Sequence, residues 1–173
     1  MCGHPGKKLL FMGQEFGQWN EWSEKRALDW YLLEDDSHKE LKDFTKACLI
    51  LNKKYRCLYG TDYSPEGFRW INANDKDNSV FSFIRISPDK KRHLLFVLNF
   101  TPVERPNHRI GVPVKGKYKL VLGDDMKNQK KTLTSVRGEC DGYKESLLID
   151  LHRYGIAVYE FNGDVNAHKP TKI

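Results

Sequence analysis

Apolar positions in residues 1–60 predict one short strand and one helix. A largely apolar run at residues 8–12, closed by Gly13, is typical of a strand covered on both faces, as in parallel sheets. From Ser37 to Tyr55, apolar residues recur at steps of three and four, which marks one face of an α-helix. Ser37 and Glu40 match a capping box, so we expect the helix to begin with Ser37 as its N-cap. The apolar face consists of Leu41, Phe44, Cys48, Leu51 and Tyr55.

This strand and this helix form a single β/α unit. A buried strand needs neighbours on both edges to satisfy its backbone N–H and C=O groups, and residues 1–60 contain no second strand pattern. The segment is therefore expected to be the last unit of something larger. It is expected to be held by docking of its helix on the following domain, or by self-association.

Residues 61–163 show the pattern of a mostly β fold. Short apolar runs alternate with turn-forming segments such as Asn74–Asn78 and Ser87–Asp89, and no helix-period stretch interrupts them. This predicts an antiparallel β-sandwich of about six to eight strands. Strands are expected at residues 68–72, 80–87, 94–100, 118–122, 147–151 and 156–161. Residues 164–173 lack any pattern and are expected to form a disordered tail.

Composition narrows the classes of function. No apolar run approaches the ~20 residues of a membrane helix and no signal peptide is recognisable, so a cytoplasmic location and no membrane partner are expected. The net charge is +6, but the lysines come as scattered pairs without interleaved aromatics, which favours a solvated surface over nucleic-acid binding. The four cysteines and six histidines lack zinc or disulfide spacing, so no metal site and no cofactor are expected.

Residues His4–Gln18, followed by Glu21-Trp22 and Leu28-Asp29-Trp30, strongly resemble a segment of bacterial glycogen (1,4-α-glucan) branching enzymes of the α-amylase superfamily. In that family the segment is the eighth strand of a (β/α)8 barrel with its outgoing loop, and the next helix is the last barrel helix. Shorter motifs between residues 67 and 118 resemble the C-terminal all-β domain that the family shares with α-amylases. The resemblance therefore implies a truncated barrel remnant at residues 1–60 and a C-terminal β-sandwich domain at 61–163.

Two short segments depart from the family pattern. Residues 124–129 stand where the family usually has a Gly-rich turn, and Leu151-His152-Arg153 stands where it usually has Leu-Pro-Pro. Both lie in the predicted β domain, so they affect its loops and not the resemblance.

The resemblance implies a glycosyltransferase whose catalytic residues lie elsewhere. Branching cleaves an α-1,4 bond and transfers the released glucan to a 6-hydroxyl with retention. This requires a carboxylate nucleophile and a carboxylic acid about 5–5.5 Å apart. In the family these groups, and a stabilising Asp, lie on strands that precede the segment resembled by His4–Gln18. No catalytic residue is therefore assigned, the chain alone is expected to be inactive, and neither Glu15 nor Glu21 is expected to substitute.

The loop after residues 8–12 holds the candidate glucan-contact residues. Sugar rings stack their apolar faces on indoles, while amides and carboxylates bind the hydroxyls. The candidates are Gln14, Glu15, Gln18, Trp19 and Trp22. The competing interpretation is that Phe16, Trp22 and Trp30 anchor the loop. Packing is preferred for Trp22 and Trp30, whereas Trp19 fits either role equally.

Three functional classes are open at this point. The first is the non-catalytic C-terminal part of a branching enzyme, whose partners are the barrel and α-1,4-glucan or glycogen. The second is a free-standing β-sandwich module that binds α-glucan. The third, a basic nucleic-acid-binding β domain, is disfavoured because no recognition motif accompanies the charge.

Overall fold

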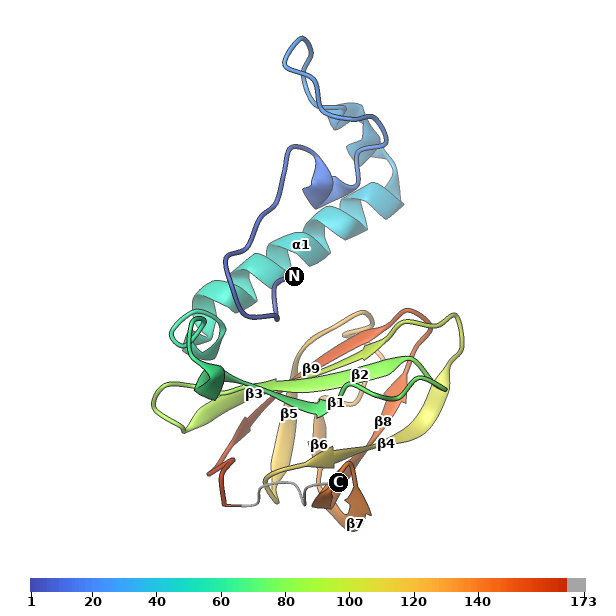
Figure 1. The fold of residues 1–173 in the computed structure, drawn as a ribbon. Helices are drawn as coiled ribbons and strands as arrows, with labels where there is room; N and C mark the ends of the chain where they lie inside the picture. The colour runs from blue at the N-terminus through green and yellow to red at the C-terminus, as the bar shows by residue number, and fades with distance from the viewer. Residues whose placement is uncertain (168–173) are drawn as a thin grey trace.

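The computed structural model describes residues 1–167 and consists of an N-terminal arm resting on a two-sheet β domain (Figure 1). The arm contains irregular segments and one long helix, α1, at Asp36–Lys54. Two short 3-10 helices, Gln14–Phe16 and Trp30–Glu34, flank the aromatic loop, and two more, Arg56–Leu58 and Pro65–Gly67, lead into the β domain.

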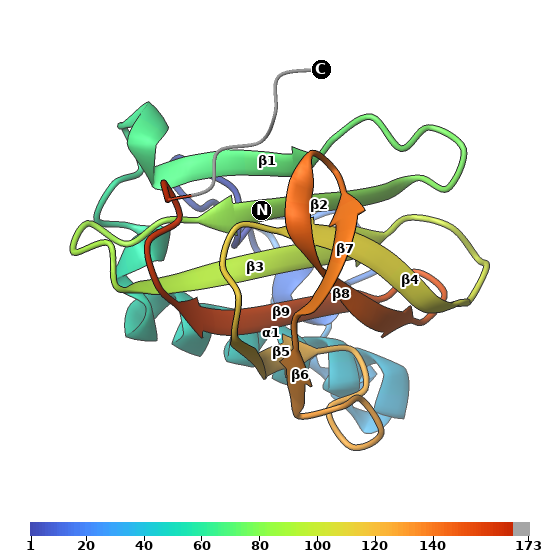
Figure 2. The same cartoon turned by 90° about the horizontal axis from the view of Figure 1, so that it is seen from below.

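The β domain is an antiparallel sandwich of nine described strands, slightly more than expected. The larger sheet has the order β1-β2-β3-β9-β5-β6, and the smaller sheet has the order β4-β8-β7. Figure 2 shows the smaller sheet lying across the larger one. The strand bounds are β1 Phe68–Asn72, β2 Val80–Arg85, β3 Arg92–Asn99, β4 Arg105–Val112, β5 Lys117–Gly123, β6 Thr132–Thr134, β7 Val136–Cys140, β8 Tyr143–Leu151 and β9 Ile156–Asn162.

The larger sheet is covered on both faces at its centre. Its inner face packs against the smaller sheet through a cluster that includes Ile84, Leu95 and Leu147. Its outer face packs against α1 through a second cluster that includes Phe96 and Leu51. This double cover explains why four consecutive β3 residues, Leu94, Leu95, Phe96 and Val97, are all buried. The expected docking of the helix on the β domain is thereby confirmed.

The helix begins earlier than expected. Asp35, not Ser37, is the N-cap: its carboxylate accepts a hydrogen bond from the Ser37 backbone N–H at 2.8 Å. The Ser37 hydroxyl also donates to the Asp35 carboxylate, so Ser37 supports the cap and does not form it. An ionised carboxylate is the stronger acceptor at the positive end of a helix, which is why it takes this role. The predicted inward face holds for Cys48, Leu51 and Tyr55, whereas Leu41 is exposed.

The strand expected at residues 8–12 is wrong. These residues are irregular, and Leu9, Phe11 and Met12 are about half exposed or more. The described chain provides no neighbouring strand with which they could pair, so their backbone gains nothing from an extended conformation. The wider division of the chain near residue 60 stays a prediction.

The predicted β strands are confirmed with small shifts of their ends, but β4, β6 and β7 were missed. β4 carries Pro106 and a register irregularity between Arg105 and His108, with Asn107 at a φ of 51°. These features break the alternation on which a strand prediction depends. β6 has three residues and β7 is mostly exposed, so neither carries an apolar signal.

The disordered tail expected at residues 164–173 is wrong for its first residues. Val165 is fully buried in the inner cluster. Arg69 donates from Nη1 to the Val165 carbonyl oxygen at 2.8 Å and from Nη2 to Asn166 Oδ1 at 2.6 Å. Residues 168–173 lie outside the described residues. Among residues 1–167, no helix is long and apolar enough to cross a membrane.

Candidate functional site

The loop that carries the candidate residues is built around one buried ring. Phe16 lies in the 3-10 turn between Gly13 and Gly17, whose φ angles of 86° and 71° favour glycine. The Phe16 ring is fully buried and packs on Trp30 with 5.0 Å between centroids. Phe16 therefore packs inside the arm, whereas its anchoring of the loop to a barrel stays a prediction.

A buried histidine of α1 supports the same loop. His38 Nδ1 donates to the Phe16 carbonyl oxygen at 2.7 Å. The His38 ring also meets the Trp19 indole edge-on, with 5.3 Å between centroids. Trp19 is 77% exposed, so its indole is accessible to a ligand although His38 of α1 packs against it.

A second support is the carboxylate of Asp29, which is buried. Asp29 Oδ2 accepts from Asn20 Nδ2 at 2.9 Å, and Oδ1 lies 3.6 Å from Arg26 Nη1. The Asp29 backbone N–H donates to Gln18 Oε1 at 2.8 Å. These contacts join the two ends of the loop. No sequence pattern marks a buried loop carboxylate, so sequence reasoning missed this role of Asp29.

The two candidate glutamines are partly occupied by the loop itself. Gln14 Oε1 accepts from the Phe11 N–H at 3.0 Å. Gln18 Nε2 donates to the Asn20 carbonyl oxygen at 2.8 Å, in addition to its bond from Asp29. Both side chains therefore stabilise the loop, and only their remaining amide atoms are available to a ligand.

The other three candidates lie in different environments. Trp22 packs edge-on against Phe11 at 5.5 Å between centroids and is partly exposed. Glu15 is half-buried, and Trp19 is the most exposed of the three. The loop thus offers aromatic faces beside polar groups, an arrangement suited to binding a sugar.

The buried acid of the loop, Asp29, is engaged with Asn20 and Arg26. In the part of the chain that the structure describes, no group of three or more His, Cys, Asp or Glu side chains could hold a metal ion.

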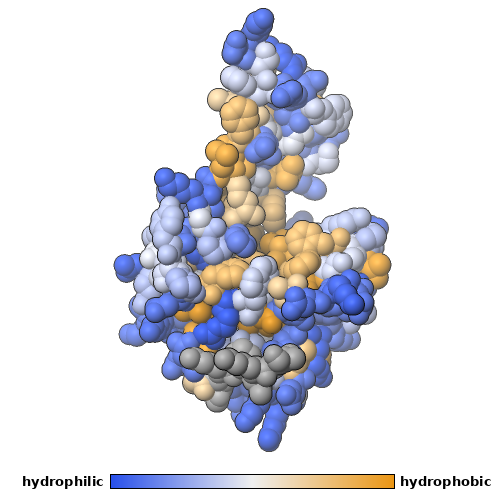
Figure 3. All heavy atoms as spheres, viewed as in Figure 1, coloured by the Kyte–Doolittle hydropathy of each residue, from blue (hydrophilic) through white to orange (hydrophobic). Residues whose placement is uncertain are grey.

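An apolar groove of about 690 Å³ lies between α1, the first four residues and the outer face of the larger sheet. Figure 3 shows hydrophobic side chains gathered in the hollow where the arm meets the β domain. The sheet lines the groove with Trp70, Phe81, Phe83 and Phe96, and α1 lines it with Leu41, Phe44 and Cys48. Phe100, which follows β3, also lines it. Sequence reasoning placed these aromatics in strands but could not locate the groove, because it forms only when the helix docks.

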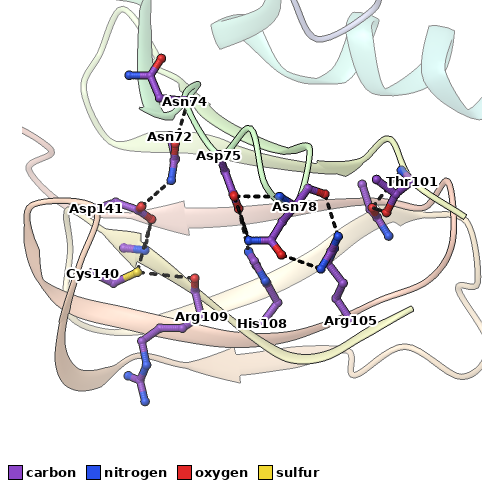
Figure 4. Close-up of polar contacts among 12 residues, drawn as sticks. Asn72, Asn74, Asp75, Asn78, Thr101, Arg105, His108, Arg109, Cys140 and Asp141 are labelled. Carbon is purple, nitrogen blue, oxygen red and sulfur yellow. Dashed lines mark hydrogen bonds and ion pairs between the residues drawn. The ribbon is translucent and has the colours of Figure 1, made fainter. Parts of the chain in front are cut away.

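A polar cluster ties the β1–β2 loop to the smaller sheet (Figure 4). Asn72 Nδ2 donates to Asp141 Oδ1 at 2.8 Å, and Asp141 Oδ2 accepts from the Gly111 N–H at 2.8 Å. Arg105 Nη1 donates to Asn78 Oδ1 at 2.6 Å. Since these side chains mainly bond one another, the cluster cross-links the two sheets.

The fold defines the class of protein. The family model described as "Alpha amylase, C-terminal all-beta domain" matches residues 70–162, which cover all nine strands except part of β1. The chain belongs to this family. The β-sandwich fold expected from the resemblance is therefore confirmed.

Particular relatives are enzymes of one kind. The chain is 45% identical over 168 residues to a 1,4-alpha-glucan branching enzyme of Butyrivibrio fibrisolvens, covering 93% of this chain and 26% of that enzyme. It is 45% identical over 127 residues to the Aquifex aeolicus enzyme of that name, covering 73% of this chain and 20% of the enzyme. The Bacillus cereus enzyme is 37% identical over 162 residues, covering 90% of this chain and 25% of the enzyme. The chain thus spans about a quarter of the length of the curated relatives it matches.

Proposed function

We propose that this chain forms the C-terminal part of a 1,4-α-glucan branching enzyme that makes α-1,6 branches in glycogen. In this proposal it stabilises the catalytic barrel and does not catalyse by itself. The observation that carries the proposal is the exposed apolar run at residues 8–12, next to a groove lined almost entirely by apolar side chains. An exposed apolar surface of this kind marks an interface. The 45% identity over 93% of the chain supports the barrel as the partner.

The helix α1 points to the same partner. One side docks on the larger sheet through Cys48 and Leu51, while Leu49 and Ile50 remain exposed on another side. A helix with apolar side chains on more than one side is normally covered on more than one side. In the proposal, α1 lies between the β domain and the barrel.

The proposal assigns the loop a contact role toward α-1,4-glucan. Trp19 and Trp22 stack on sugar rings, and Glu15 accepts hydrogen bonds from sugar hydroxyls. Gln14 and Gln18 hold the loop and contribute their remaining amide protons. The carboxylate nucleophile and the carboxylic acid come from the barrel strands, because the part of the family that this chain resembles contains neither group. The cytoplasmic location expected from the sequence stays a prediction.

A chimera tests this proposal. The last quarter of the Butyrivibrio fibrisolvens enzyme is replaced by this chain, and α-1,6 linkages are counted by debranching the product. The chimera is expected to be active, whereas this chain alone and the relative without its last quarter are expected to be inactive. Branching by this chain alone, or a folded chimera without activity, would contradict the proposal.

A free-standing α-glucan module is the second candidate, favoured by the exposure of Trp19. Retardation of the isolated chain in glycogen-containing gels separates the two functions. Tight, saturable binding by the isolated chain together with an inactive chimera favours the module. Weak binding together with an active chimera favours the branching enzyme. Sedimentation of the isolated chain reports whether its exposed apolar surface drives self-association.

A further inference from the structure

A pocket of about 300 Å³ lies at the end of the smaller sheet where β4 ends and β7 and β8 begin, apart from the aromatic loop. It is formed by the turn between β4 and β5, by β7 and by β8, which lie together in Figure 2. Its lining residues are Val112, Pro113, Lys115, Arg137, Lys144 and Glu145.

The pocket is held in shape by one buried serine. The Gly116 N–H donates to Ser135 Oγ at 3.0 Å, and the Ser135 hydroxyl donates to Glu145 Oε2 at 2.9 Å. The Ser135 backbone N–H also donates to the Gly116 carbonyl oxygen at 2.8 Å. This chain of bonds fixes the backbone beside Lys115 against β8, so the pocket walls do not depend on a ligand.

The charges in the pocket are unbalanced. Three cations, Lys115, Arg137 and Lys144, face a single carboxylate, Glu145, which leaves two positive charges. Within residues 1–167, none of the three cations forms an ion pair within 4.0 Å or a side-chain hydrogen bond. One oxygen of the Glu145 carboxylate is already engaged by Ser135.

We propose that this pocket binds a phosphate group carried by a sugar. A phosphate monoester has a charge of about −1.5 to −2 at neutral pH, which matches the two uncompensated positive charges, whereas a carboxylate would leave one of them unmatched. The Arg137 guanidinium can bond two phosphate oxygens while the lysines act as point charges. Val112 and Pro113, which are both buried, form the apolar floor of the pocket. A pocket of about 300 Å³ is at the small end of the usual range for ligands, which suits a single phosphorylated sugar unit.

The phosphate can come from two sources, a free sugar phosphate or an ester on an α-glucan. Binding of inorganic phosphate, glucose 6-phosphate, phosphorylated amylopectin and glucose to the chain is measured at low salt by titration calorimetry. Glucose 6-phosphate is expected to bind more tightly than inorganic phosphate, and neutral glucose is expected not to bind in this pocket. Tighter binding of phosphorylated amylopectin than of glucose 6-phosphate, lost in Arg137→Gln with Lys144→Gln, would identify the polymer as the source.

Charge variants decide whether the pocket is responsible. Arg137→Gln with Lys144→Gln is expected to weaken binding of glucose 6-phosphate by about tenfold or more. The matched control, Lys39→Gln with Lys46→Gln on α1, removes the same charge outside the pocket and is expected to leave binding within about twofold. Glu145→Gln keeps an acceptor for Ser135 but removes the opposing charge, so binding is expected to tighten severalfold. A tightening cannot result from misfolding.

Three results would overturn the proposal. The first is equal weakening in the pocket and control variants, which would indicate general attraction of anions to a basic protein. The second is no heat of binding with millimolar glucose 6-phosphate. The third is a DNA duplex that binds more tightly than glucose 6-phosphate and is affected equally by both double variants.

Discussion

His152 Nδ1 donates a hydrogen bond of 2.8 Å to Asp124 Oδ2, and this bond joins the two segments at which the sequence departs from the branching-enzyme pattern. Asp124 Oδ1 also accepts from the Ile156 N–H at 2.8 Å. The two segments are therefore linked through Asp124. His152 stands where the family usually has proline, and the polar loop at residues 124–129 supplies the hydrogen-bond acceptor that this histidine needs, the Asp124 carboxylate.

The first prediction concerns this pair. Asp124→Ala removes acceptors from His152 and from the Ile156 N–H, and is expected to lower the free energy of unfolding by about 1–3 kcal/mol. His152→Ala removes one partly exposed donor and is expected to cost less, about 0.5–1.5 kcal/mol. Urea denaturation measures both values. Equal effects of the two variants would contradict a central role for Asp124.

The second prediction concerns acid stability. His93 is fully buried: its Nδ1 accepts from the Ser87 N–H at 3.2 Å and its Nε2 donates to the Gly163 carbonyl oxygen at 3.0 Å. Burial lowers the pKa of His93 below its ordinary value of 6.5, although hydrogen bonds to the carbonyl oxygens of Gly163 and Lys90 oppose the shift. The unfolded chain therefore binds the proton more readily than the folded chain.

Stability should consequently be complete above pH 6.5 and decline as the pH falls toward the lowered pKa of His93. His93→Gln is expected to be less stable at pH 7 but to lose less stability between pH 7 and pH 5. Thermal unfolding at both pH values checks this. Burial also lowers the pKa of His108, so His108→Gln serves as a comparison that removes a second acid-sensitive group. An unchanged pH dependence in His93→Gln would exclude His93 as the main acid-sensitive group.

The third prediction concerns a buried ion pair. Arg85 is fully buried, contacts Asp62, and donates from Nη1 to the Gly3 carbonyl oxygen at 2.9 Å. Asp62→Ala leaves the guanidinium charge uncompensated and is expected to cost about 3–5 kcal/mol. Arg85→Met with Asp62→Leu is expected to recover much of that loss, because it removes both charges. Chemical denaturation measures the two free energies, and a double variant as unstable as Asp62→Ala would contradict this account.

The fourth prediction concerns Trp19. Trp19→Ala is expected to weaken glucan binding by the chimera by roughly fivefold, since stacking of one aromatic ring contributes about 1 kcal/mol. Stability should change little because the indole is 77% exposed. Tyr63→Ala, at an exposed ring of the β domain, is the matched control and should leave binding unchanged. Equal losses in both variants would remove Trp19 from the binding site.

The fifth prediction concerns the exposed side of α1. Ile50→Glu is expected to leave the isolated chain folded, because Ile50 is exposed there, yet to reduce the activity or stability of the chimera strongly. Lys46→Glu, on the same helix, changes the charge without touching the apolar surface and serves as the control. Circular dichroism of the isolated chain and branching assays of the chimera compare the two variants.

Sequence reasoning recovered the elements that have strong periodicity. β1 matches its predicted bounds, and β3, β5 and β9 differ by a few residues, because their apolar positions face two covered surfaces. It failed where tertiary contacts decide the outcome. Residues 8–12 have a strand sequence but no strand partner, and β4 has a partner but an irregular sequence around Asn107.

The candidate loop shows the same division. The sequence identified the residue types suited to sugar binding but not which of them are occupied. Gln18 bonds Asn20 and Asp29, which are contacts across the loop that leave no periodic signal in the sequence. His38 carries no sequence signal for a role in the loop, yet its ring packs against Trp19 from α1.

The double cover of the larger sheet sets the size of the unit that can fold on its own. The family match begins at residue 70, but a chain cut there would leave Phe83, Phe96 and Leu122 on the outer face without α1. Bare aromatic strands of this kind favour aggregation. A unit that folds on its own therefore has to include α1, whose N-cap lies about thirty-five residues before the domain that the sequence family delimits. Expression trials should place the cut before the helix cap.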